Sequence, residues 1–209
     1  MESKLYIVIN AKQTLGQSLS MRLAQRGNNV VFLSNDEQLG YALAAEEPRV
    51  RFRRCTSLNS KEVAAEYHWS ERCISAVHGI VIMVPIKESL LLDDDYCQAL
   101  LSDCGYQSTN RDSSLSITYV VFPEQDDESL TLKSLHLELC KRAHNADKRA
   151  DTPRVNHVIL SDIAAGDTES DADLANETSE LIHYLTSTTS QSLQSQAFYF
   201  GNNRNQTPI

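Results

Sequence analysis

The chain has 209 residues, five cysteines and a net charge of −9 at pH 7. This acidic balance argues against binding to nucleic acid, and no segment approaches the roughly 20 apolar residues that span a membrane. The cysteines form no CxxC pair and the first residues are no secretory leader, so we expect a cytoplasmic protein with reduced thiols. The length favours one α/β domain over residues 1–209, ending in a flexible tail at 202–209.

The first segment has the pattern of a strand, a loop and a helix. The apolar run at residues 5–9 predicts a buried parallel strand, and the polar residues 10–14 predict a loop. A second apolar run at residues 30–33 predicts the next strand. Between them, leucines recur at helical spacing before a turn at Gly27: Leu15, Leu19 and Leu23.

This loop stands where a dinucleotide-binding fold holds phosphate. Such a loop needs glycines for a tight turn, for close approach of the pyrophosphate and for packing of the helix on the strand. Only Gly16 is present, while Asn10 replaces the first glycine and tolerates a left-handed backbone. Thr14 replaces the second, and its β-branched side chain would fill the space of the phosphate oxygens. We expect the turn to persist and the phosphate site to be lost.

An alternation of arginines predicts a third strand, with Arg49, Arg51 and Arg53 projecting from one face. One interpretation is an anionic ligand such as a nucleotide phosphate. The preferred interpretation is that charge on an edge strand blocks unwanted strand pairing.

Acidic residues mark the start of a later helix. Asp93, Asp94 and Asp95 resemble paired carboxylates of a metal or acid–base site, but such residues also complement the dipole at a helix start, which we prefer. The helix is predicted to stop near residues 104–105.

A helix predicted at residues 130–144 carries further candidates. Ser129 and Lys133 lie one helical turn apart and could form a Ser–Lys nucleophile pair, although no oxyanion-hole glycines accompany them. One side of the helix carries possible zinc or copper ligands, but three ligands over two turns cannot all reach one ion, so we expect a packing stripe and no metal. These side chains are His136, Cys140 and His144.

An ordered series of segments resembles the short-chain dehydrogenases/reductases (SDR). INAKQTLG matches the family's opening TGxxxGIG, and RVNHVILSDI at residues 154–163 is similar to its RVNxIxPGxI. The resemblance implies a three-layer, doubly wound parallel sheet of the Rossmann-like SDR type, with the third strand at an edge. The other matching segments are residues 55–63, 79–85, 116–123 and 193–202.

The resemblance also shows where cofactor chemistry departs from the family. The adenine-contacting aspartate falls at Thr56. The family's NNAG loop is replaced by the more apolar residues 83–86, which suggests a rebuilt cofactor floor. We therefore expect no cofactor, with NAD(P) as the alternative.

The catalytic positions depart further. The family's serine falls near Phe122 or Pro123, and its asparagine falls within residues 99–102, where no asparagine exists. The YxxxK pair falls on Ser129 and Lys133, so the tyrosine that acts as general acid is absent. These positions are degenerate, and we assign no catalytic residue.

The preferred hypothesis is a pseudoenzyme of the SDR oxidoreductases. It would be a structural or regulatory subunit that acts through protein contacts, as a homodimer or with an active SDR relative. One alternative is a sensor that binds NAD(P) without turnover. Another is a divergent NAD(P)-dependent oxidoreductase whose substrate supplies its own acid.

Overall fold

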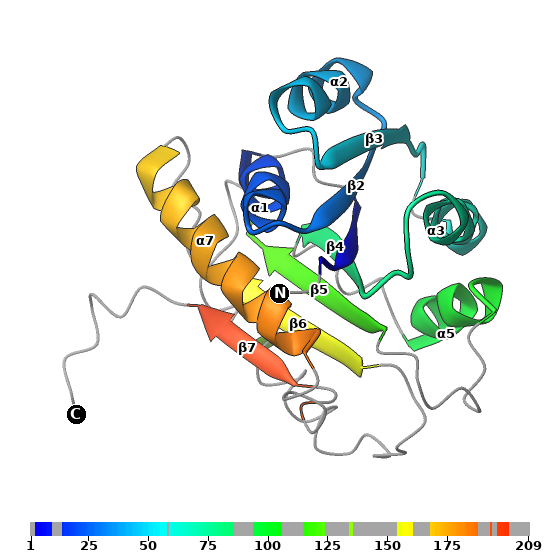
Figure 1. Ribbon diagram of the computed structural model, residues 1–209. Helices are drawn as coiled ribbons and strands as arrows, with labels where there is room; N and C mark the ends of the chain where they lie inside the picture. The colour runs from blue at the N-terminus through cyan, green and yellow to red at the C-terminus, as the bar shows by residue number, and fades with distance from the viewer. Residues whose placement is uncertain are drawn as a thin grey trace.

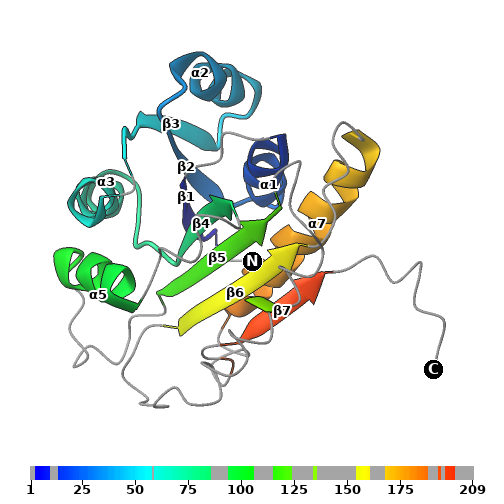
Figure 2. The same cartoon turned by 180° about the vertical axis from the view of Figure 1, so that it is seen from behind.

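A seven-stranded parallel sheet, with helices on both faces, forms the described part of the chain (Figures 1 and 2). The strand order is β3-β2-β1-β4-β5-β6-β7, which confirms the predicted doubly wound, Rossmann-like fold of SDR type. The computed structural model describes residues 3–9, 14–57, 59–85, 94–105, 115–123, 134–135, 154–160, 168–187, 193 and 196–200.

The strands alternate with helices along most of the described chain. The strands are β1 (Leu5–Ile9), β2 (Asn29–Ser34), β3 (Val50–Arg54), β4 (Gly79–Pro85), β5 (Ser116–Phe122), β6 (Arg154–Leu160) and β7 (Ala197–Phe200). The helices are α1 (Thr14–Gln25), α2 (Glu37–Glu46), α3 (Ser60–Cys73), α5 (Asp94–Asp103) and α7 (Thr168–Leu185). Within these described helices, no segment is long and apolar enough to cross a membrane.

The sheet separates two apolar clusters because side chains alternate along each strand. In β1, Leu5, Ile7 and Ile9 belong to the cluster beneath α3 and α5. Tyr6 and Val8 point the other way, into the cluster beneath α1, α2 and α7. Figures 1 and 2 show these two helical layers on opposite sides of the strands. Both faces of the central strands are therefore buried, as their continuous apolar runs predict.

Helix α1 confirms the predicted leucine spacing. Leu15, Leu19 and Leu23 are at most 1% exposed and pack on the sheet. Just after the helix, Gly27 adopts a φ of 89°, a backbone conformation that side chains with a β-carbon rarely adopt. The chain thus turns from α1 directly into β2 at the position that the sequence indicates.

Strand β3 lies at one edge of the sheet, as expected, but it is shorter than the arginine pattern suggests. It begins at Val50, so Arg49 precedes the strand, and only Arg51 and Arg53 alternate within it. Helix α5 begins at Asp94 and ends at Asp103, with Gly105 at a φ of 69°. This early end confirms the predicted stop near residues 104–105.

Candidate functional site

The carboxyl edge of the sheet, between β1 and β4, is the candidate site. The chain winds outward from β1 through β2 to β3, and outward from β4 through β5 to β7, so the order reverses between β1 and β4 (Figure 1). In open α/β sheets, ligands bind outside the carboxyl ends of the strands at such a switch point. The described residues that bear on this edge follow β2, β3 and β5 or form the end of β4.

A carboxylate closes the turn that follows β3. Glu62 of α3 accepts hydrogen bonds from the backbone N–H of Thr56 at 2.7 Å and of Ser57 at 3.2 Å. It also accepts from the two hydroxyls, at 3.1 Å from Thr56 and 2.9 Å from Ser57. The hydrogen bond from the Thr56 backbone is the largest of the effects that lower the pKa of Glu62. The donors at the position that matches the family's adenine-contacting aspartate are thus already hydrogen-bonded to Glu62 at the surface of the protein.

The thiol beside this turn is buried and protonated. Cys55 is 7% exposed, and its Sγ donates to the carbonyl oxygen of Ser57 at 3.0 Å. Burial, followed by the charge of Glu62, raises the pKa of Cys55 to about 11. A thiol of this kind is a poor nucleophile because the reactive thiolate is scarce.

An acidic residue that the sequence analysis missed follows β2. Asp36 stands 20 positions after Gly16, near the place where dinucleotide folds use an acidic residue to bind ribose. Here its carboxylate accepts from the backbone N–H of Leu39 at 3.0 Å and caps α2. Its own N–H donates to Ser34 Oγ at 3.1 Å. An acid directly after the second strand was the signal that would have found it.

The end of β4 occupies part of the expected cofactor floor. Met83 and Val84 are 1% and 0% exposed, and they point into the clusters on opposite faces of the sheet. They are core residues of β4 and do not form a common surface. Pro85 ends the strand in register with Phe122 of β5. Residues 83–85 therefore belong to β4 and not to a loop, while the rebuilt cofactor floor stays a prediction.

The other described positions that match the family's catalytic residues carry neither its serine nor its asparagine. Phe122 is 2% exposed in the core, and Pro123 follows it. Within residues 99–102 on α5, Leu100 is buried while Ala99 and Ser102 are exposed. Helix α1 begins at Thr14, and Gly16 is buried in its first turn.

Several candidates fall beyond the described part of the chain. Among the described residues, no group of three His, Cys, Asp or Glu side chains could hold a metal ion. The candidates outside the described residues are Asn10, Ile86, Asp93, Ser129, Lys133, His136, Cys140 and His144.

The arginines around β3 hold the edge of the sheet to its neighbours. Arg53 binds Glu66 of α3 through two hydrogen bonds, at 2.7 and 3.0 Å, and lies 4.4 Å from the centre of the Trp69 ring. Arg49 donates to the carbonyl oxygen of Gly27 at 3.0 Å, and Arg51 is exposed. These contacts favour the edge interpretation over a shared anion site.

A shallow hollow lies elsewhere, on the exposed face of α3. Its lining consists of Ala65, His68, Glu71 and Arg72. His68 Nε2 lies 3.1 Å from the carbonyl oxygen of Asp103, which links α3 to the end of α5. These side chains belong to a helix face that points to solvent and not to the switch point.

Comparison with known proteins identifies the fold and nothing finer. The sequence matches no protein-family model and no curated protein. An SDR from Serratia marcescens is similar in structure, with a TM-score of 0.64 and 12% identity over 95% of this chain and 96% of that chain. A double mutant of an SDR from the same organism matches equally well. BdcA from E. coli has a TM-score of 0.60 and 12% identity over 94% of this chain and 97% of that one. The chain therefore has an SDR-like fold.

Proposed function

We propose that this protein is a catalytically inactive, SDR-like subunit that acts in the cytoplasm through protein contacts. Its partner would be a second copy of itself or an active SDR relative. The observation that carries the proposal is the hydrogen bonding of Glu62 to the turn at Thr56 and Ser57. A bound adenine would have to compete with a carboxylate that already uses these donors.

Two further features support loss of the chemistry. The acid after β2, Asp36, caps α2 instead of facing a ribose. The positions that match the family's serine are Phe122 and Pro123, which carry no hydroxyl. A side chain without a titratable proton cannot act as a general acid.

The test is titration with NADH and NADPH, followed by thermal shift and by quenching of Trp69, the single tryptophan. A cofactor at a hundred times its dissociation constant would add about 2.7 kcal/mol of stability. We expect no saturable effect with the wild-type chain. Glu62→Ala is expected to free the turn after β3, and Glu71→Ala on the exposed face of the same helix is the control. Saturable binding to the wild-type chain would contradict the proposal.

A nucleotide sensor without turnover is the second candidate. It is favoured by Gly16, which is buried in the first turn of α1 as a packing glycine of a dinucleotide fold would be. Saturable binding of NADH or NADPH without consumption of the cofactor would identify the sensor. Consumption of the cofactor in the presence of a carbonyl substrate would instead identify a divergent oxidoreductase.

The partner is tested separately. Purification from the native host by a tag on this chain should recover either a homodimer or a complex with an SDR. Recovery as a lone monomer would contradict the proposed role as a subunit.

A further inference from the structure

The last turn of α7 is fastened to the start of β1 by a chain of side chains. Tyr6 Oη lies 2.8 Å from Thr186 Oγ1 and 3.2 Å from His183 Nδ1. Lys4 Nζ donates to Thr186 Oγ1 at 3.0 Å and to the carbonyl oxygen of His183 at 3.3 Å. Tyr6 is 0% and Thr186 3% exposed, so water cannot easily replace these partners.

The direction of the hydrogen bonds in this series of side chains depends on the protonation of His183. Lysine can only donate, so one arrangement runs from Lys4 to Thr186, from Thr186 to Tyr6, and from Tyr6 to His183 Nδ1. This arrangement requires an unprotonated Nδ1. A protonated His183 would donate to Tyr6, whose hydroxyl would then donate to Thr186. Thr186 would then donate its hydrogen to a helix carbonyl, that of His183 at 2.9 Å or that of Ile182 at 3.2 Å.

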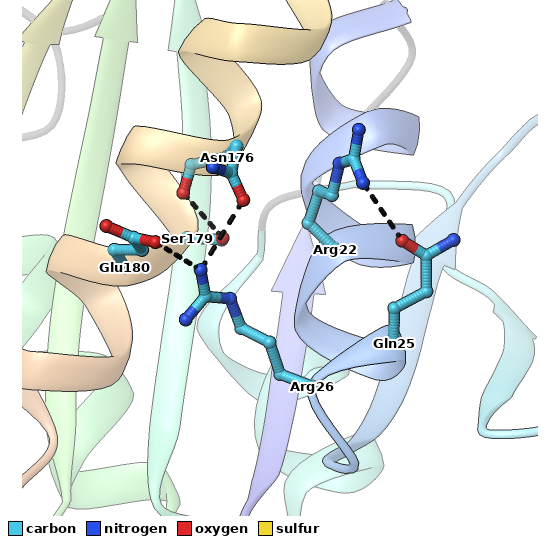
Figure 3. Close-up of polar contacts among 6 residues, drawn as sticks. All are labelled: Arg22, Gln25, Arg26, Asn176, Ser179 and Glu180. Atoms are coloured by element: carbon cyan, nitrogen blue, oxygen red, sulfur yellow. Dashed lines mark hydrogen bonds and ion pairs between the residues drawn. The ribbon is translucent and has the colours of Figure 1, made fainter.

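The charges around the histidine are unfavourable for a further proton. Burial, and then the cations Lys4 and Arg26, lower the pKa of His183. The nearby carboxylate on its own helix, Glu180, is already bound by Arg26 at 2.6 Å (Figure 3). Burial, and then the positive charge of Arg154 of β6, lower the pKa of Lys4.

We propose that His183 makes the docking of the last turn of α7 on β1 sensitive to pH. The neutral ring accepts a hydrogen bond from Tyr6 and holds the last turn of α7 in place. The protonated ring reverses the direction of the hydrogen bonds among these side chains and adds a cation beside Lys4 and Arg26. The inference does not depend on the proposed function, because it concerns the amino ends of the strands and not the switch point.

The direction of the effect follows from the pKa of His183. The pKa lies below its ordinary value of 6.5, so the folded state binds this proton less readily than the unfolded state does. The stabilising contribution is complete above 6.5. It is lost as the pH falls from 6.5 toward the pKa of the folded state.

The test is amide hydrogen exchange of residues 182–186, compared between about pH 7.5 and about pH 5.5 after correction for intrinsic rates. We expect protection in the wild-type chain to fall several-fold at the lower pH. His183→Gln keeps an acceptor for Tyr6 but does not titrate, so its protection should stay constant. His68→Gln, on the exposed face of α3, is the matched control and should behave as the wild type.

Two outcomes of this exchange experiment would overturn the inference. One is an equal fall in protection in His183→Gln and in the wild type, and the other is constant protection in the wild type. A titration of the wild-type chain by NMR covers the case in which the variant does not fold. The His183 ring signal should titrate with a midpoint below 6.5, and a midpoint at or above 6.5 would also overturn the inference.

Discussion

The ring of Phe52 lies directly against the backbone of Gly40, where a β-carbon would stand 2.1 Å from Phe52 Cδ2. This contact seats α2 on the edge strand β3. We predict that Gly40→Ala destabilises the protein by about 1–3 kcal/mol because the added methyl overpacks the interface. The better helix propensity of alanine offsets only about 1 kcal/mol of this. Urea unfolding of the two chains measures the difference.

The control for this prediction is the same substitution in a chain that also carries Phe52→Ala. Without the ring, the methyl at position 40 has room, so Gly40→Ala should then be neutral or stabilising. An equal cost in both backgrounds would show that the two residues do not interact in the expected way.

The contacts of Arg53 with Glu66 and Trp69 should contribute to the stability of the β3 edge. Arg53→Met removes both hydrogen bonds and leaves Glu66, whose side chain is 13% exposed, without its cation. We predict a loss of about 1 kcal/mol together with a change in tryptophan emission. Arg53→Lys keeps the charge but not the bidentate hydrogen bonding, so it should recover only part of the lost stability. Full recovery by lysine would argue that charge alone matters.

The thiols should differ sharply in reactivity. Burial raises the pKa of Cys55 to about 11 and that of Cys104 to about 12, while Cys73 is exposed. At about pH 8, iodoacetamide should therefore modify Cys73 well before Cys55 or Cys104. Peptide mass spectrometry gives the order, and urea should remove the difference. Modification of Cys55 as fast as Cys73 in the folded chain would contradict the buried position.

The stability of the protein at acid pH should depend on Glu62. Its pKa is lowered from 4.5, so its stabilising contribution is present above 4.5 and is lost as the pH falls through the value of the folded state. Glu62→Gln should therefore flatten the dependence of the unfolding midpoint on pH below about 4.5. Thermal unfolding across this range tests the expectation, and an unchanged slope would mean that the carboxylate contributes little.

Much of the fold could be predicted because strands that are buried on both faces appear in the sequence as continuous apolar runs. Strands β1 and β4 match the apolar runs at residues 5–9 and 79–85, and α1 follows from leucines that recur every four residues. The turn at Gly27 follows from glycine's freedom to adopt positive φ. These features depend on neighbours close in sequence.

The candidate site was harder to predict because its contacts depend on how the turns fold. Glu62 reaches back to Thr56 only once α3 is in place, and Asp36 is used by its own helix. The rebuilt cofactor floor at residues 83–86 stays a prediction, since Met83 and Val84 point to opposite faces of β4 and Ile86 lies outside the described residues.

The strand order also bears on how the sheet can assemble during synthesis. From β4 onward, each new strand pairs with the one made just before it, and β1 to β3 likewise extend outward from the centre. Each newly synthesised strand can therefore pair at once with an exposed edge of the sheet that has already formed. The pairing of β1 with β4 joins strands that are far apart in the sequence. This step should therefore decide when β1–β3 and β4–β7 become a single folding nucleus.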